Sequence, residues 1–111
     1  MKGVRLVNIG CVIYKKNFEK GSLDADWHFE INRKQVNGTG KAIGNPGNSY
    51  AGEYRITYFN EKDEDIGTFD LHIKKENDFY TLNWFNNNEL KYVGTGMIYN
   101  NSLIAGWKNN Q

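Results

Sequence analysis

Apolar and polar residues alternate along much of this chain, and the alternation is clearest in Ser22–Asn32. Every second position of this segment is apolar: Leu23, Ala25, Trp27, Phe29 and Ile31. The positions between them are polar. A β-strand points successive side chains to opposite faces, whereas an α-helix repeats every ~3.6 residues. The segment is therefore predicted to be a β-strand with one buried face and one solvated face.

Shorter stretches of the same pattern predict eight strands joined by short turns. The expected strands are Val4–Lys15, Ser22–Asn32, Val36–Ile43, Tyr50–Asn60, Ile66–Lys75, Phe79–Phe85, Leu90–Tyr99 and Ser102–Lys108. Asn and Gly are frequent in the turns, and both residues tolerate the backbone angles of tight hairpins. Val4–Lys15 carries apolar residues on both faces. Burial on both sides or a bulge near Asn8–Gly10 would produce that pattern.

The number and order of the strands predict the fold. Strands that follow one another through short turns favour a meander over Greek-key crossovers. Eight antiparallel strands in this order are predicted to close into an all-β, up-and-down (meander) β-barrel, because closure removes the exposed edges of the sheet. A β-sandwich is the alternative. The length of 111 residues indicates a single domain, residues 1–111.

A hairpin unit recurs in the sequence. Val93–Trp107 contains a Gly-Thr-Gly, a turn and a returning strand with a large aromatic residue, and Val36–Tyr54 repeats these pieces in the same order. Glycines within strands favour the strong coiling of a small barrel. The segment from Gly38 to Lys41 also resembles part of a phosphate-binding loop, but such a loop continues with Ser or Thr and opens a helix, and here Ala42 follows. The repeat is therefore interpreted as a building unit of the barrel.

The strand count and the hairpins resemble the calycin-type barrels, the group that contains lipocalins, fatty-acid-binding proteins and avidins. Gly52–Tyr58 and Ala105–Trp107 carry the resemblance, which extends over nearly the whole chain. A short, helix-free, aromatic-rich chain is most similar to the avidin subgroup. The chain has neither the Gly-x-Trp opening strand of lipocalins nor the Trp-Asn-x-x-Gly-Ser segment of avidins, so no ligand residues are carried over. The resemblance implies small-molecule binding inside the barrel.

The predicted inward face is rich in aromatic rings. Its members are Leu23, Trp27, Phe29, Ile31, Tyr54, Ile56, Tyr58, Phe69, Leu71, Ile73, Tyr80, Leu82, Trp84, Tyr92, Ile98, Leu103 and Trp107. The interior of an eight-stranded barrel is either filled by side chains or holds one small ligand. Both alternatives stay open. An interior that holds a ligand predicts non-enzymatic binding of a small apolar or aromatic molecule. The candidate ligand-binding residues are Trp27, Phe29, Tyr54, Tyr58, Tyr80, Trp84, Tyr92 and Trp107.

Apolar residues also occupy outward positions on the first strand and the last three strands, which become neighbours when the barrel closes. The candidate interface residues are Val7, Ile9, Ile13, Phe79, Phe85, Val93, Met97, Tyr99 and Ile104. An outward apolar patch of this extent usually marks an interface. A homodimer or higher homo-oligomer is therefore expected. A protein-interaction module with a filled core, acting through the same patch, is the second functional hypothesis.

The sequence gives little indication of a catalytic site or a metal site. His28 and His72 alternate with predicted inward residues, so they are expected to face solvent. No catalytic motif, metal site or cofactor is expected. A barrel isomerase or cyclase is a weaker alternative, and Glu53 is the only titrating residue that could serve it near the barrel mouth.

Composition limits the partners. The formal net charge of +1 argues against nucleic acid or an anionic membrane surface held by bulk charge. Cys11 is the only cysteine, which excludes an internal disulfide. No apolar run reaches the roughly 18 residues of a membrane helix, and no signal-peptide pattern opens the chain. A cytoplasmic location is expected, with a mature secreted chain as the alternative.

Overall fold

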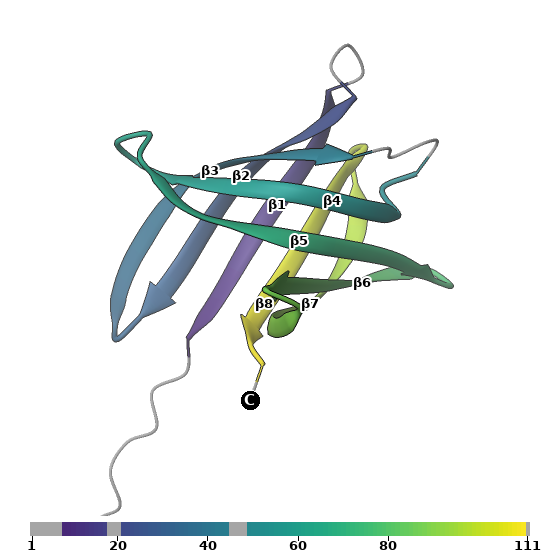
Figure 1. Cartoon of the computed structure of the whole chain (residues 1–111). Helices are drawn as coiled ribbons and strands as arrows, with labels where there is room; N and C mark the ends of the chain where they lie inside the picture. Colours follow the sequence, from purple (N-terminus) through teal and green to yellow (C-terminus); the bar gives the residue numbers. More distant parts are fainter. Residues whose placement is uncertain (1–7, 18–20, 45–48, 111) are drawn as a thin grey trace, which may run out of the picture.

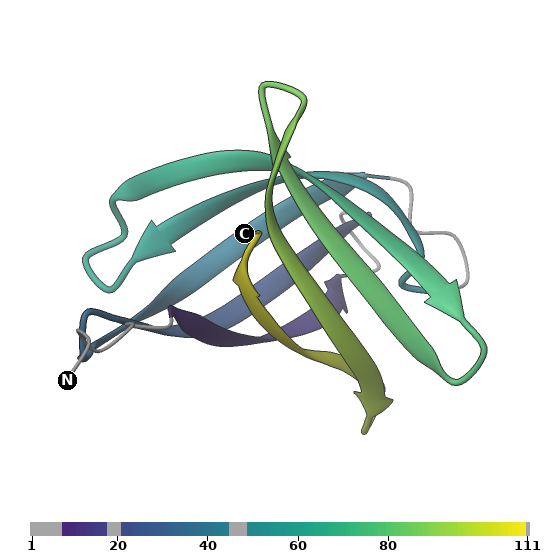
Figure 2. The same cartoon turned by 90° about the horizontal axis from the view of Figure 1, so that it is seen from below.

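The computed structural model describes residues 8–17, 21–44 and 49–110 and forms a closed barrel (Figure 1, Figure 2). Its strands are β1 (Ile9–Asn17), β2 (Ser22–Ile31), β3 (Lys34–Gly44), β4 (Gly52–Asn60), β5 (Asp65–Glu76), β6 (Phe79–Asn86), β7 (Glu89–Tyr99) and β8 (Ser102–Asn109). Each strand pairs antiparallel with the next, and β8 pairs with β1. The predicted all-β, eight-stranded meander barrel is confirmed, and the β-sandwich alternative is wrong.

The predicted strand bounds differ from the observed ones mainly at the first, third and fourth strands, and β3 extends beyond the predicted Val36–Ile43 at both ends. β1 begins at Ile9 in the described part of the chain, and Val4 and Val7 lie outside the described residues. β4 begins at Gly52, because Tyr50 and Ala51 belong to the connection that precedes it. The alternation in β2 is confirmed, since Leu23, Ala25 and Trp27 are buried and the residues between them are exposed.

Asparagine pairs form the tight turns of two hairpins. Asn87 and Asn88 join β6 to β7, and Asn100 and Asn101 join β7 to β8. All four have positive φ, between 49° and 65°. Two consecutive residues with positive φ are the mark of the turn whose twist matches a β-hairpin, and Asn tolerates this conformation better than most residues.

Tyr50 closes one end of the barrel. Its side chain is buried, and its hydroxyl donates a hydrogen bond to the carbonyl oxygen of Asn101, in the β7–β8 turn, at 2.7 Å. The hydroxyl of Tyr54, in β4, donates to the carbonyl oxygen of Tyr50 at 2.8 Å. Because β4 and β8 lie on opposite sides of the closed sheet, these bonds hold Tyr50 across the barrel end. This end and the middle of the barrel hold its fully buried large side chains: Tyr14, Leu23, Ile56, Leu71, Leu82 and Leu103.

Two predicted inward residues are exposed. Ile31 is the last residue of β2 and is 36% exposed, and Ile98 is the penultimate residue of β7 and is 43% exposed. Alternation assigns a side chain to one face of the sheet, but it does not tell where along the strand the packed interior ends. Both predictions of burial are therefore wrong because these positions lie at the rims of the barrel.

A β-bulge reshapes the start of β5. Tyr58 pairs with Gly67 and Phe59 pairs with Asp65, which leaves Ile66 as an extra residue. Gly67 has a φ of 152°, a conformation that residues with a side chain rarely adopt. An extra residue bends the strand and redirects the neighbouring side chains. Simple alternation from Phe69 predicts that Ile66 lies on the outer face of the barrel. Because of the bulge, Ile66 instead lies at the open end of the barrel interior.

Candidate functional site

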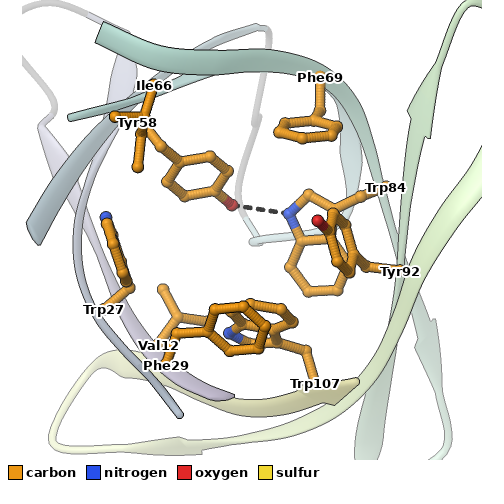
Figure 3. A pocket seen from close by; sticks show the side chains of 9 residues that line it. All are labelled: Val12, Trp27, Phe29, Tyr58, Ile66, Phe69, Trp84, Tyr92 and Trp107. Carbon is orange, nitrogen blue, oxygen red and sulfur yellow. Dashed lines mark hydrogen bonds between the residues drawn. The ribbon is translucent and has the colours of Figure 1, made fainter. Parts of the chain in front are cut away.

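A cavity of about 190 Å³ opens at the end of the barrel opposite Tyr50 (Figure 3). Its lining residues are Val12, Trp27, Phe29, Tyr58, Ile66, Phe69, Trp84, Tyr92 and Trp107. Seven of the eight strands contribute to this lining, the exception being β3. β3 still shapes the cavity, because its Gly38 makes room for the Trp27 indole.

The cavity brings together most of the predicted ligand-binding residues. Trp27, Phe29, Tyr58, Trp84, Tyr92 and Trp107 all line it. Tyr54 and Tyr80 do not line it. Both are buried in the half of the barrel that Tyr50 covers, Tyr54 near the start of β4 and Tyr80 near the start of β6. They face inward as predicted, but they fill the closed half.

The rings of the lining contact one another around the cavity and form what we call the aromatic collar: Trp27, Phe29, Tyr58, Phe69, Trp84, Tyr92 and Trp107. Phe29 stacks on Trp107 with ring centroids 4.3 Å apart. The other neighbouring rings meet edge to face or tilted, with centroids between 5.1 and 6.4 Å apart. Such geometries are favourable for aromatic pairs. Contacts between neighbouring rings therefore hold the collar rings in position around the opening.

Glycines on neighbouring strands make room for the rings of the collar. Trp107 is paired across strands with Gly10, and Trp27 is paired with Gly38. A Cβ atom at Gly10 would overlap the Trp107 indole, and one at Gly38 would lie 2.7 Å from the Trp27 indole. Each indole therefore lies flat over a glycine and along the barrel wall. This arrangement leaves the centre of the opening free. The glycines in these strands are therefore needed for close packing of the indoles as well as for the coiling of the barrel.

Two tyrosines and a tryptophan form a hydrogen-bonded group at the inner side of the cavity. The indole Nε1–H of Trp84 donates to the hydroxyl oxygen of Tyr58 at 2.6 Å (Figure 3). The hydroxyls of Tyr58 and Tyr14 are 2.8 Å apart and share a hydrogen bond. The indole of Trp27 is engaged elsewhere, since its Nε1–H donates to the carbonyl oxygen of Thr39 at 2.8 Å.

Burial keeps these tyrosines neutral. Desolvation raises the pKa of Tyr14 well above its ordinary value, and the neighbouring Tyr58 hydroxyl adds to the rise. Desolvation also raises the pKa of Tyr58, although its hydrogen bonds with Tyr14 and Trp84 work in the opposite direction. A phenol with a raised pKa is a poor base at neutral pH and serves as a hydrogen-bonding group.

Charged side chains lie away from the cavity. The described lining contains no carboxylate, imidazole, amine or thiol. Glu53, the candidate for the enzyme hypothesis, has a side chain that is 82% exposed and lies 3.8 Å from His72 on the outer surface. Its placement near the barrel mouth is therefore wrong, because it alternates with the inward Tyr54. His28 is also exposed, as predicted.

The outward apolar residues lie on adjoining strands, as the strand order requires. Five of them are exposed: Ile9, Ile13, Phe79, Met97 and Tyr99. Phe85, Val93 and Ile104 are half-buried, and Val7 lies outside the described residues. Met97 pairs with Ile104 across β7 and β8, and Ile104 pairs with Ile13 across β8 and β1. We call the exposed and half-buried members together the outer patch.

Some residues of the site were missed from the sequence. Val12 and Tyr14 belong to β1, where apolar residues on both faces left the inward side undecided. The bulge at Gly67 brings Ile66 to the cavity, and a glycine within a predicted strand is the signal that could have indicated it. Phe69 was expected inside but not at the ligand site.

Comparisons with known proteins give no relative. No protein-family model matches the chain, and neither the curated proteins nor the solved structures searched contain a significant match. Over the described residues, the structure has no helix with the length and apolar character needed to cross a membrane.

Proposed function

We propose that this barrel binds a small apolar or aromatic molecule in the cavity of the aromatic collar, without catalysing its conversion. The observation that carries the proposal is an open cavity lined almost entirely by aromatic side chains, with a few hydroxyl and indole groups among them. Small-molecule sites are typically concave and apolar, with a small number of polar groups that fix the orientation of the ligand. The cavity also supports the finer resemblance to the calycin-type barrels, which bind small molecules inside the barrel.

The dimensions of the cavity favour a ligand with one ring. An apolar cavity of about 150 Å³ is large enough to hold benzene. The cavity of about 190 Å³ therefore accommodates one aromatic ring with a short substituent. Larger molecules would extend past Ile66, which is half exposed at the opening.

A cavity-filling substitution tests the proposal. Val12→Phe places a ring into the cavity from β1, and we expect it to abolish the tryptophan fluorescence change and the heat of binding that a one-ring compound such as acetophenone produces in the parent protein. Ile13→Phe is the matched control, since Ile13 is the next residue and faces outward. Overpacking costs about 1–3 kcal/mol, so thermal unfolding must establish that the Val12 variant is folded. Equal binding by both variants would place the ligand outside the collar.

We further propose that the protein self-associates through the outer patch. Met97 and Tyr99 are each at least 60% exposed, and they adjoin Ile104 and Ile13 on the neighbouring strands. Exposed apolar side chains that are contiguous favour association because burial removes them from water. A symmetric dimer would bury the same patch on both copies. The patch equally supports the second functional hypothesis, an interaction module that uses it to bind another protein.

A charge in the outer patch tests self-association. We expect Met97→Glu to shift the protein from dimer to monomer in sedimentation velocity, because burying an unpaired carboxylate at an interface is costly. Ile43→Glu is the control, since Ile43 is 66% exposed on β3, away from the patch. A parent protein that remains monomeric at high concentration would contradict the dimer.

A further inference from the structure

The hydrogen bonding of Tyr14 determines where the proton of the Tyr58 hydroxyl points. Tyr14 is fully buried, with 0% of its surface exposed. Among the described residues, the Tyr58 oxygen is the one acceptor for its hydroxyl proton, because the indole N–H of the nearby Trp84 can only donate. A buried hydroxyl that donates no hydrogen bond destabilises the folded state, because in the unfolded chain the same hydroxyl would donate to water. Tyr14 therefore donates its proton to the Tyr58 oxygen, since the reverse direction would leave the Tyr14 proton unpaired.

The Tyr58 oxygen accordingly accepts two hydrogen bonds. One comes from Tyr14 at 2.8 Å and the other from the Trp84 indole at 2.6 Å. A hydroxyl oxygen has two acceptor sites, so both are occupied. The proton of Tyr58 then has no acceptor among the described residues, and Tyr58 itself lines the cavity. Figure 3 shows the Tyr58 hydroxyl reaching toward the centre of the opening between Phe69 and Trp84.

We propose that the ligand is a neutral one-ring aromatic compound with a carbonyl-type oxygen that accepts the free O–H of Tyr58. This inference rests on the proposed function, small-molecule binding in the collar. Hydrogen bonds polarise one another in chains, so a hydroxyl that already accepts two bonds is a stronger donor. The collar supplies the flat surfaces for the ring, and the Tyr58 proton supplies a directed polar contact.

The lining selects against charged ligands. Aromatic faces attract quaternary ammonium groups, but such a group offers no acceptor to the Tyr58 proton, which presents positive partial charge to the cavity. A carboxylate could accept the proton, but it would lose its hydration without a cation nearby in the described lining. A neutral carbonyl group meets both requirements.

Two compounds of nearly equal shape test the proposal. Acetophenone and α-methylstyrene differ by an oxygen in place of a CH2 group, and only acetophenone accepts a hydrogen bond. Isothermal titration of the full chain should give a dissociation constant about five- to tenfold lower for acetophenone. Tyr58→Phe should abolish this preference while retaining binding of α-methylstyrene. The double variant Tyr14→Phe with Tyr58→Phe should behave in the same way, and it avoids leaving the Tyr14 hydroxyl without a partner.

Two further variants test the direction of the hydrogen bonds. Tyr80→Phe removes a buried tyrosine hydroxyl from the closed half of the barrel, outside the lining, and should retain the preference for acetophenone. Tyr14→Phe should also retain it, because Tyr58 still carries its proton toward the cavity. A parent protein without the preference that gains it in Tyr14→Phe would mean that Tyr58 donates to Tyr14, and the proposal would be wrong.

The remaining outcomes separate this inference from the proposed function. Equal binding of both compounds by the parent protein and by Tyr58→Phe would overturn the acceptor requirement and leave ligand binding in the collar intact. Tighter binding of phenyltrimethylammonium or benzoate than of acetophenone would overturn the choice of a neutral ligand. Binding of none of the four compounds would overturn both the inference and the proposed function for ligands of this size.

Discussion

Gly38→Ala is expected to lower the free energy of unfolding by about 3 kcal/mol or more. A Cβ atom at this position would overlap the backbone carbonyl oxygen of Phe59 and would lie 2.7 Å from the Trp27 indole. Neither neighbour can move freely, because Phe59 belongs to the β3–β4 ladder and the Trp27 indole is bonded to Thr39. Urea denaturation followed by far-ultraviolet circular dichroism measures the loss.

Gly106→Ala is the matched control for this experiment. Gly106 is also in a strand, but the nearest atom to an added Cβ there is the Gly10 carbonyl oxygen at 3.9 Å. Alanine in a strand is favoured over glycine by roughly 0.5–1 kcal/mol because glycine loses more backbone entropy. The control should therefore be neutral or slightly stabilising. Equal stability of both variants would contradict the close packing of Trp27 on the β3 backbone.

Stability is expected to fall steeply above pH 10. Burial raises the pKa of Tyr54 to about 12, and it raises the pKa values of Tyr14 and Tyr58 as well. Tyrosine in the unfolded chain ionises near pH 10. Above that pH the unfolded state therefore binds fewer protons than the folded state, and stability decreases as pH rises. Each tyrosine that stays protonated contributes a slope of up to about 1.4 kcal/mol per pH unit.

Denaturation curves between pH 8 and pH 11 test this dependence. Tyr54→Phe should flatten the decline above pH 10, because phenylalanine does not ionise in the unfolded chain. Its contribution spans the window from pH 10 to about 12. Tyr99→Phe controls for the substitution itself, since Tyr99 is exposed in the outer patch. A Tyr54 variant with an unchanged slope would contradict the role of its buried hydroxyl.

The sequence predicts the architecture well because the alternation is repeated in many strands. A slip of one residue exchanges the inner and outer faces, so the run from Leu23 to Phe29 determines the orientation of β2 with little ambiguity. Two-residue turns that contain Asn then make hairpins of four connections: β2–β3, β5–β6, β6–β7 and β7–β8. Neighbouring strands must be antiparallel, and the order of the barrel follows.

The position of the cavity along the barrel axis could not be predicted in the same way. Alternation indicates that Tyr54, Tyr58 and Tyr80 face inward, but all three are equivalent in that pattern. Their different roles depend on Tyr50, which closes one end through a connection without periodicity. Tyr14 was missed for a related reason, since its importance arises from a contact with Tyr58 that lies 44 residues away in sequence.

Because Tyr50 closes one end of the barrel, a ligand is expected to enter and leave the cavity through the other end. In the part of the chain that the structure describes, the cavity opens there, toward the β2–β3, β4–β5 and β6–β7 connections. A ring bound with its oxygen toward Tyr58 has its opposite edge at this entrance. Substituents there would extend into solvent, whereas substituents beside the oxygen would meet the packed half of the barrel. The position of a substituent on the ring, more than its size, would then decide whether a compound is accepted.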